Sequence, residues 1–115
     1  MERLILLTLT LLTLVTTHAQ TLREAFDGKF LIGVALNQWQ VDSTDPQVQN
    51  LIRTQFSALV AENCMKAESL QPREGQFHFD EADRLVALAR ENNQAVTGHC
   101  LVWHSQAPDW WFTDG

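Results

Sequence analysis

The chain has few basic residues, few cysteines and no glycine-rich phosphate loop, and each shortage argues against a class of protein. Its 8 lysines and arginines stand against 14 acidic residues, which gives a formal net charge of −6. No basic stripe is present, so nucleic acid is not expected as a partner. No glycine-rich loop follows a predicted strand, which argues against a nucleotide-binding fold.

The two cysteines, Cys64 and Cys100, are not spaced like the framework of a small disulfide-stabilised domain. One bridge between them stays open as an alternative, but disulfide geometry is specific and a sequence does not reveal it. We favour two buried free thiols. A zinc site that adds His99 and His104 is a further alternative, although the spacing matches no common zinc motif. We therefore predict no metal site.

A long apolar run occurs near the amino terminus and nowhere later, so no later segment could cross a membrane. The run from Leu4 to Val15 is interrupted only by threonines, and it is shorter than the about 20 apolar residues that a membrane helix needs. Thr17-His18-Ala19 offers the small residues that a signal peptidase reads. We predict a signal peptide over residues 1–19 and a secreted or periplasmic protein without membrane contact after cleavage. A retained lipid or helix anchor is the alternative.

Hydrophobic periodicity predicts alternating strands and helices in residues 20–115. The first expected helix is short and is capped by Thr21. The second begins at Asp45-Pro46 and runs to Phe56. The third is capped by Asp80, with Asp83 in a capping box, and runs to Asn92; its apolar face consists of Ala82, Leu85, Val86 and Ala89. The expected strands are Phe30–Ala35, Ser57–Ala61 and one that begins at Ala95. This order implies βαβ units, a parallel sheet and therefore an α/β fold.

Two clusters of polar residues, 62–66 and 98–106, directly follow the second and third predicted strands. Ligands bind at the carboxyl ends of the strands in parallel α/β folds. The second cluster contains two imidazoles, an indole and an amide within nine residues. Planar hydrogen bonders with an aromatic face suit a pyranose ring. The sequence therefore predicts an enzyme that cleaves polysaccharides.

Several ordered motifs closely resemble the opening third of glycoside hydrolase family 10, which consists mostly of endo-1,4-β-xylanases on a (β/α)8 barrel. The resemblance runs from about Phe30 to Trp111 and is carried by Glu62-Asn63-x-Met65-Lys66, Leu70-Gln71-Pro72, Gly75-Gln76-Phe77 and Gly98-His99-x-Leu101-Val102-Trp103-His104-Ser105-Gln106. It implies the first three βα units of a truncated TIM barrel. Residues 20–115 would then be the incomplete N-terminal part of a family 10 catalytic domain.

The resemblance assigns roles to the first cluster. Glu62, Asn63 and Lys66 resemble the family's hydrogen bonders to the sugars on the non-reducing side of the cleavage point. A charged group that bonds a neutral hydroxyl gives a strong and directional contact. Taken alone, Glu62 and Lys66 would be interpreted as an ordinary exposed ion pair, which contributes under about 1 kcal/mol.

The resemblance also assigns roles to the residues of the second cluster. His99 and Gln106 resemble further ligands of those sugars, and Trp103 resembles the tryptophan beneath the sugar next to the scissile bond. His104 resembles a histidine that supports the ligands from behind. Taken alone, His99 would be a structural histidine and Trp103 a core residue. The joint pattern favours the sugar-binding interpretation.

No catalytic residue is expected in this chain, because the family's two catalytic glutamates lie on the fourth and seventh strands, beyond Gly115. Glu62 matches a binding position, and Glu68 matches neither catalytic motif. We expect an N-terminal fragment, inactive in isolation, of a secreted retaining endo-1,4-β-xylanase. It would act on β-1,4-xylosidic bonds in xylan or xylo-oligosaccharides without a cofactor. A non-catalytic carbohydrate-binding protein is the alternative.

Overall fold

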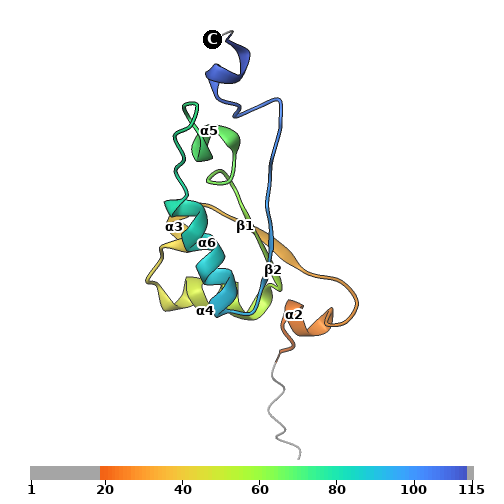
Figure 1. Cartoon of the computed structure of the whole chain (residues 1–115). Helices are drawn as coiled ribbons and strands as arrows, with labels where there is room; N and C mark the ends of the chain where they lie inside the picture. Colours follow the sequence, from red (N-terminus) through yellow and green to blue (C-terminus); the bar gives the residue numbers. More distant parts are fainter. Residues whose placement is uncertain (1–18, 114–115) are drawn as a thin grey trace, which may run out of the picture.

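Three parallel strands form one sheet in the order β1-β2-β3 in the computed structural model, which describes residues 19–113 (Figure 1). The strands are β1 (Gly33–Leu36), β2 (Ala58–Ala61) and β3 (Ala95–Thr97). The register places Gly33 opposite Ala58 and Ala58 opposite Ala95. The predicted parallel α/β sheet is confirmed. The signal peptide predicted over residues 1–19 falls almost entirely outside the described residues.

Two of the helices begin where a side chain bonds a free backbone N–H group. Helix α4 (Pro46–Gln55) has Pro at its first position, and the Asp45 side chain accepts a bond from the Gln47 N–H at 2.8 Å. Helix α2 (Leu22–Ala25) begins with a capping box between Thr21 and Glu24. These two starts were predicted from the sequence, and both are confirmed.

Helix α6 (Asp80–Glu91) does not begin as predicted. Phe79 occupies the N-cap position and its carbonyl already accepts a helical bond from Asp83 at 2.8 Å, so Asp80 is the first helical residue and no side chain caps this end. The acidic residues of the first turn still lie near the positive end of the helix dipole. At the other end, Asn92 is the C-cap, and Asn93 just beyond it adopts a left-handed φ of 52°.

Three short helices were not predicted: α3 (Gln38–Val41), α5 (Ala67–Leu70) and the 3₁₀ helix η1 (Asp109–Phe112). Each has four residues, which is too short for a hydrophobic period to show. Strand β1 also begins later than the predicted Phe30. The backbone of Ile32 instead bonds Ser57, through its N–H to the hydroxyl and through its C=O to the N–H of that residue.

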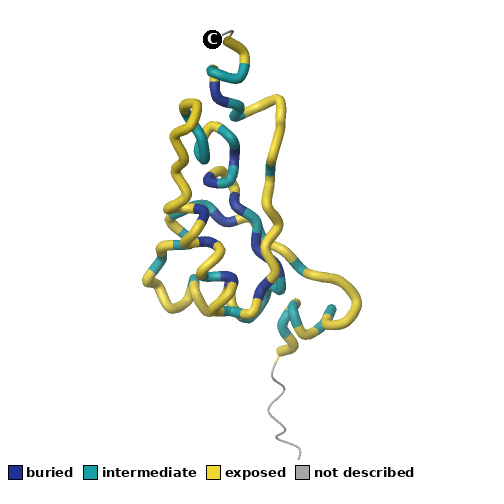
Figure 2. The backbone as a smooth tube through the Cα atoms, viewed as in Figure 1, coloured by how far each residue is buried: buried dark blue, intermediate teal, exposed yellow. Residues whose placement is uncertain are grey.

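The core lies between the sheet and the two long helices, which cover the same face of it (Figure 2). Leu59 of β2 and Leu85 of α6 are fully enclosed, whereas Val86, predicted to share the apolar face, is 36% exposed. The other face of the sheet is lined by small residues. Strand β3 is exposed throughout. The core is therefore built from β1, β2, α4 and α6.

Arg23 joins α2 to the carboxyl ends of both long helices. Its guanidinium donates to the carbonyl oxygens of Arg53 (3.3 Å), Asn92 (3.0 Å) and Asn93 (2.8 Å). A cation at a helix carboxyl end also complements the helix dipole. No helix within residues 19–113 is both long and apolar enough to span a bilayer.

Candidate functional site

Both predicted clusters lie at the carboxyl end of the sheet, where β2 leads into α5 and β3 leads into the long segment beside it (Figure 1). The Glu62 N–H donates to the Leu36 carbonyl at 2.9 Å. This bond extends the β1–β2 ladder by one residue. The first cluster therefore starts from a backbone position that the sheet fixes.

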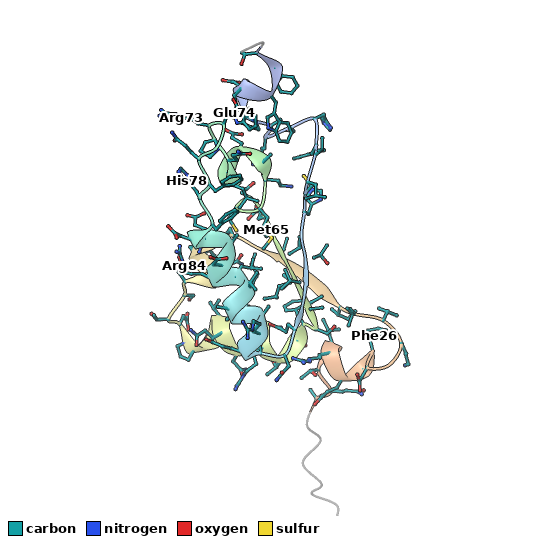
Figure 3. The ribbon with its side chains drawn as sticks, viewed as in Figure 1. Phe26, Met65, Arg73, Glu74, His78 and Arg84 are labelled. Atoms are coloured by element: carbon teal, nitrogen blue, oxygen red, sulfur yellow. The ribbon has the colours of Figure 1, made fainter. Side chains whose placement is uncertain are left out.

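The turn after β2 is anchored by buried residues and by its own backbone. Cys64 is buried, and Met65 packs against the core at the end of the strand (Figure 3). The Lys66 N–H donates to the Asn63 carbonyl at 2.9 Å, and the Lys66 carbonyl accepts from the N–H groups of Ser69 and Leu70 to begin α5. The backbone thus holds Asn63 and Lys66 in one turn.

The side chains of this turn differ in how far they are exposed to solvent. Glu62 and Asn63 are exposed, whereas Lys66 is 6% exposed. Among the described residues no ion pair joins Glu62 to Lys66. The interpretation of an ordinary exposed pair at helical spacing is therefore wrong, because residues 62–66 form a turn and Lys66 is enclosed.

The aromatic side chains of the second cluster lie together. The His99 and Trp103 ring centroids are 5.9 Å apart, and those of Trp103 and His104 are 5.1 Å apart in an edge-to-face arrangement. The Trp103 side chain is 36% exposed. His99 and His104 are exposed. An indole with an open part and imidazoles beside it can offer both stacking and hydrogen bonds to a sugar.

Two side-chain contacts join the clusters. The Lys66 ammonium lies over the Trp103 ring, 4.4 Å from its centroid. The Gln106 Nε2 donates to Asn63 Oδ1 at 3.0 Å, and the Gln106 carbonyl accepts from the Glu68 N–H at 2.9 Å. The structure therefore brings the two clusters together as one site. Glu62 lies on the same turn but contacts none of the other predicted side chains directly.

The two cysteines are free, with Cys64 buried and Cys100 half-buried. Burial raises the pKa of the Cys64 thiol, and the negative charge of Glu81 raises it further. Within residues 19–113, no three His, Cys, Asp or Glu side chains lie close enough to hold a metal ion. The zinc alternative therefore gains no support from the geometry.

Sequence reasoning missed one aromatic residue near this end of the sheet, Trp39, and it expected Trp110 either to pack at the start of the next helix or to stack on a sugar. Trp39, on the short helix α3 that follows β1, is 64% exposed. Asn37 and Gln40 form a capping box around α3, and their three-residue spacing was the available signal. Trp110 donates from its indole N–H to the Gln71 carbonyl at 2.9 Å, which ties η1 to the loop after α5.

A parallel sheet with helices on one face, and with polar and aromatic side chains gathered at its carboxyl edge, is the arrangement with which an α/β-barrel type of protein begins. The comparisons with known proteins agree. The model of the family described as "Glycosyl hydrolase family 10" matches residues 21–115. This chain belongs to glycosyl hydrolase family 10.

The similar proteins are much longer than this chain. Endo-1,4-beta-xylanase A of Xylanibacter ruminicola is 44% identical over 100 residues, which are 87% of this chain and 27% of that protein. Exoglucanase XynX of Acetivibrio thermocellus is 50% identical over 93 residues, which are 81% of this chain and 8% of that protein. The chain therefore spans about a quarter or less of these two relatives.

Solved structures show the same fold. Xylanase B from Clostridium stercorarium superposes with a TM-score of 0.76 at 45% identity, over 84% of this chain and 27% of that one. An intracellular xylanase from Thermoanaerobacterium saccharolyticum, solved as a mutant in complex with xylotetraose, gives a TM-score of 0.78 at 45% identity, over 86% and 30% of the two chains. The described sheet is thus the start of the family's (β/α)8 barrel.

Proposed function

We propose that this chain supplies sugar-binding residues to a retaining endo-1,4-β-xylanase that hydrolyses β-1,4-xylosidic bonds in xylan. The observation that carries the proposal is the joining of the two clusters through Lys66 with Trp103 and Asn63 with Gln106. Relatives named as xylanases, and a xylanase structure that holds xylotetraose, support xylan as the substrate class.

In the proposed site, each side chain has a role that follows from its chemistry. The exposed carboxylate of Glu62 and the amide of Asn63 bind sugar hydroxyls on the non-reducing side of the cleavage point. Lys66 donates to a hydroxyl from its enclosed position, and His99 donates or accepts beside it. Trp103 supports the apolar face of the sugar next to the scissile bond.

Two residues of the second cluster act next to these ligands. Gln106 binds the same sugars and also bonds Asn63. His104 supports Trp103 through the contact of their rings. Every residue proposed to bind sugar thus lies at the carboxyl end of β2 or β3, which gives a continuous surface for successive sugars.

Retention of configuration needs two carboxyl groups about 5–5.5 Å apart, one as acid and base and one as nucleophile. We assign neither role to Glu62 or Glu68, because the first belongs to the binding turn and the second matches neither catalytic motif. Both carboxyl groups then come from later strands of the barrel. Protonation and carboxylate attack complete the reaction without a cofactor. We also propose that the enzyme is exported, to the periplasm or the medium.

The experiment compares variants of the complete enzyme on xylo-oligosaccharides. We expect His99→Ala to lower kcat/KM by about 2–4 kcal/mol of transition-state stabilisation, because contacts to the distorting sugar tighten in the transition state. Glu68→Ala is the matched control, since it removes a nearby exposed carboxylate, and it should retain most activity. Residues 20–115 alone should not hydrolyse xylan.

The proposal is overturned if Glu68→Ala abolishes hydrolysis while His99→Ala leaves kcat/KM unchanged. Binding of xylo-oligosaccharides by the complete protein without any hydrolysis would instead support the alternative, a non-catalytic carbohydrate-binding protein. Isothermal titration of xylotriose together with a reducing-sugar assay separates these outcomes.

A further inference from the structure

Lys66 is the buried cation of the described chain, and its environment is unusual. Its side chain is 6% exposed, and within residues 19–113 it forms no ion pair. Its stem is enclosed, whereas the Nζ atom at the end keeps some contact with solvent and has no hydrogen-bond partner among the described residues. The described group that faces it is the Trp103 ring, with 4.4 Å between the Nζ atom and the ring centroid.

Trp103 in turn lies in a segment with little support of its own. From Gly98 to Ser105, no hydrogen bond connects the chain to any residue in the described range. The neighbouring Leu101 and Val102 are 92% and 78% exposed. Within residues 19–113 the ring contacts of the indole are with Lys66, His99 and His104. Of these three partners, Lys66 alone belongs to the anchored turn after β2.

Lys66 is suited to hold the indole because it places a cation over an aromatic face from a fixed backbone. The face of an indole is electron-rich and attracts a cation, most strongly where both are shielded from water. The backbone of Lys66 is fixed by its bonds to Asn63, Ser69 and Leu70. A fixed backbone and an enclosed stem leave the ammonium few positions. The cation can therefore act as a fixed point against which the segment that carries Trp103 is placed.

We propose that Lys66 is a positioning residue for Trp103, in addition to the sugar contact assigned to it above, and this rests on the proposed function. The cation–π contact fixes the indole plane before substrate arrives, and it uses no N–H donor in a conventional hydrogen bond. The ammonium donors thus stay available for sugar hydroxyls. Lys66 then orients the sugar through its N–H donors and also orients the Trp103 indole beneath that sugar.

The first arm of the test needs no substrate. In the complete protein labelled with ¹⁵N, we expect Lys66→Met to shift the indole N–H resonance of Trp103 more than those of Trp39, Trp110 and Trp111. Methionine keeps a long unbranched side chain and removes the charge. Lys29→Met is the control, since it removes an ammonium that lies over Phe26 instead, and it should leave the Trp103 resonance unchanged.

A second variant guards against misfolding. Arginine keeps the cation and stacks on aromatic faces, so Lys66→Arg should leave the Trp103 resonance nearer its native position than Lys66→Met does. Equal shifts at all four indoles, or no shift at Trp103 in folded Lys66→Met, would overturn the proposal. The same holds if the Arg and Met variants give indistinguishable spectra.

The second arm measures xylotriose binding by titration calorimetry in a double-mutant cycle. We expect Lys66→Met to weaken binding about tenfold or more, because it removes both a donor and the support of the indole. The double variant with Trp103→Leu should bind about tenfold more tightly than the product of the single losses predicts. Losses that simply multiply would contradict the coupling. If the unaltered protein fails to bind xylotriose, the proposed function fails, and the resonance arm still decides the positioning role.

Discussion

The turn after β2 and the segment after β3 carry the same kinds of sugar-binding side chains, but they are held in opposite ways. The first has a backbone fixed by its own hydrogen bonds, a buried Cys64 and a buried Lys66. The second forms no hydrogen bond from Gly98 to Ser105 within the described part of the chain, and its Leu101 and Val102 are exposed. One half of the site is thus built into the core, and the other depends on contacts made to it.

The comparison shows that one edge of a parallel sheet can carry a firmly held group of side chains beside a group held by fewer contacts. Segments with few buried contacts and few hydrogen bonds open at low free-energy cost. The anchored half can therefore define where the sugar lies. The dependent half makes fewer contacts within the described residues, because β3 is the edge strand of this sheet.

The largest expected effect comes from damage to the core beneath the anchored half. Leu85→Ala removes a fully buried side chain that packs with Leu59 and Cys64. We expect it to lower the free energy of unfolding by about 2–5 kcal/mol, because a cavity remains in the core. Val86→Ala, on the same helix but 36% exposed, should cost less than about 1 kcal/mol. Chemical denaturation of the complete protein measures both, and equal losses would show that the anchored half has no distinct core.

A moderate effect should appear in the reactivity of the two thiols, one in each half. The pKa of Cys64 is raised, chiefly by burial, so a smaller fraction of it is thiolate at pH 8. We expect Cys64, observed in a Cys100→Ser variant, to react with Ellman's reagent at least about tenfold more slowly than it does after denaturation.

The reciprocal Cys64→Ser variant reports on the half-buried Cys100 in the dependent half, which should react faster than Cys64 in the folded protein. The rate of Cys64 should also continue to rise with pH above 9, because its pKa is raised. A Cys64 that reacts as fast as Cys100 would remove the distinction between the halves.

The smallest effect concerns the exposed ion pair that joins α3 to α6. Arg84 donates from Nε to Asp42 Oδ1 at 2.8 Å and from Nη2 to Oδ2 at 3.3 Å. These bonds, with help from Gln38, lower the pKa of Asp42 below its ordinary value of 3.8. Since the folded pKa is the lower one, the stabilisation is present above pH 4 and is lost as the pH falls through that lower value.

An NMR titration of the Asp42 carboxyl group in the native protein and in Arg84→Met checks this sign. The midpoint should move up toward 3.8 in the variant. It should also move up in the native protein at high salt, because exposed charges are screened. A midpoint that is unchanged by the substitution would show that Arg84 does not hold the carboxylate.

Features that depend on local chemistry could be predicted from the sequence. The start of α4 at Asp45-Pro46 and the cap of α2 at Thr21 need no distant partner, and both are found. The parallel sheet and the placement of both clusters at one edge followed from the alternation of strands and helices. The start of α6 was wrong because the Phe79 carbonyl, one residue earlier, already accepts the first helical bond.

Features that depend on distant contacts could not be predicted in this way. The four-residue spacing of Glu62 and Lys66 resembled a helical ion pair, but the chain turns there and Lys66 meets an indole from another loop. The bond between Gln106 and Asn63 spans 43 positions. No local pattern encodes such a pair, although the resemblance to a family placed both residues at the sugar.

The position of Arg23 has a consequence for the order of events during synthesis. Its guanidinium reaches the carbonyl oxygens of Asn92 and Asn93, which are 69 and 70 positions further along the chain. The ribosome must therefore make and release helix α6 before the amino-terminal helix can complete its contacts. Until then Arg23 can reach only the end of α4, through the Arg53 carbonyl. Helix α2 therefore completes its bonds to the rest of the fold only after α6 has formed.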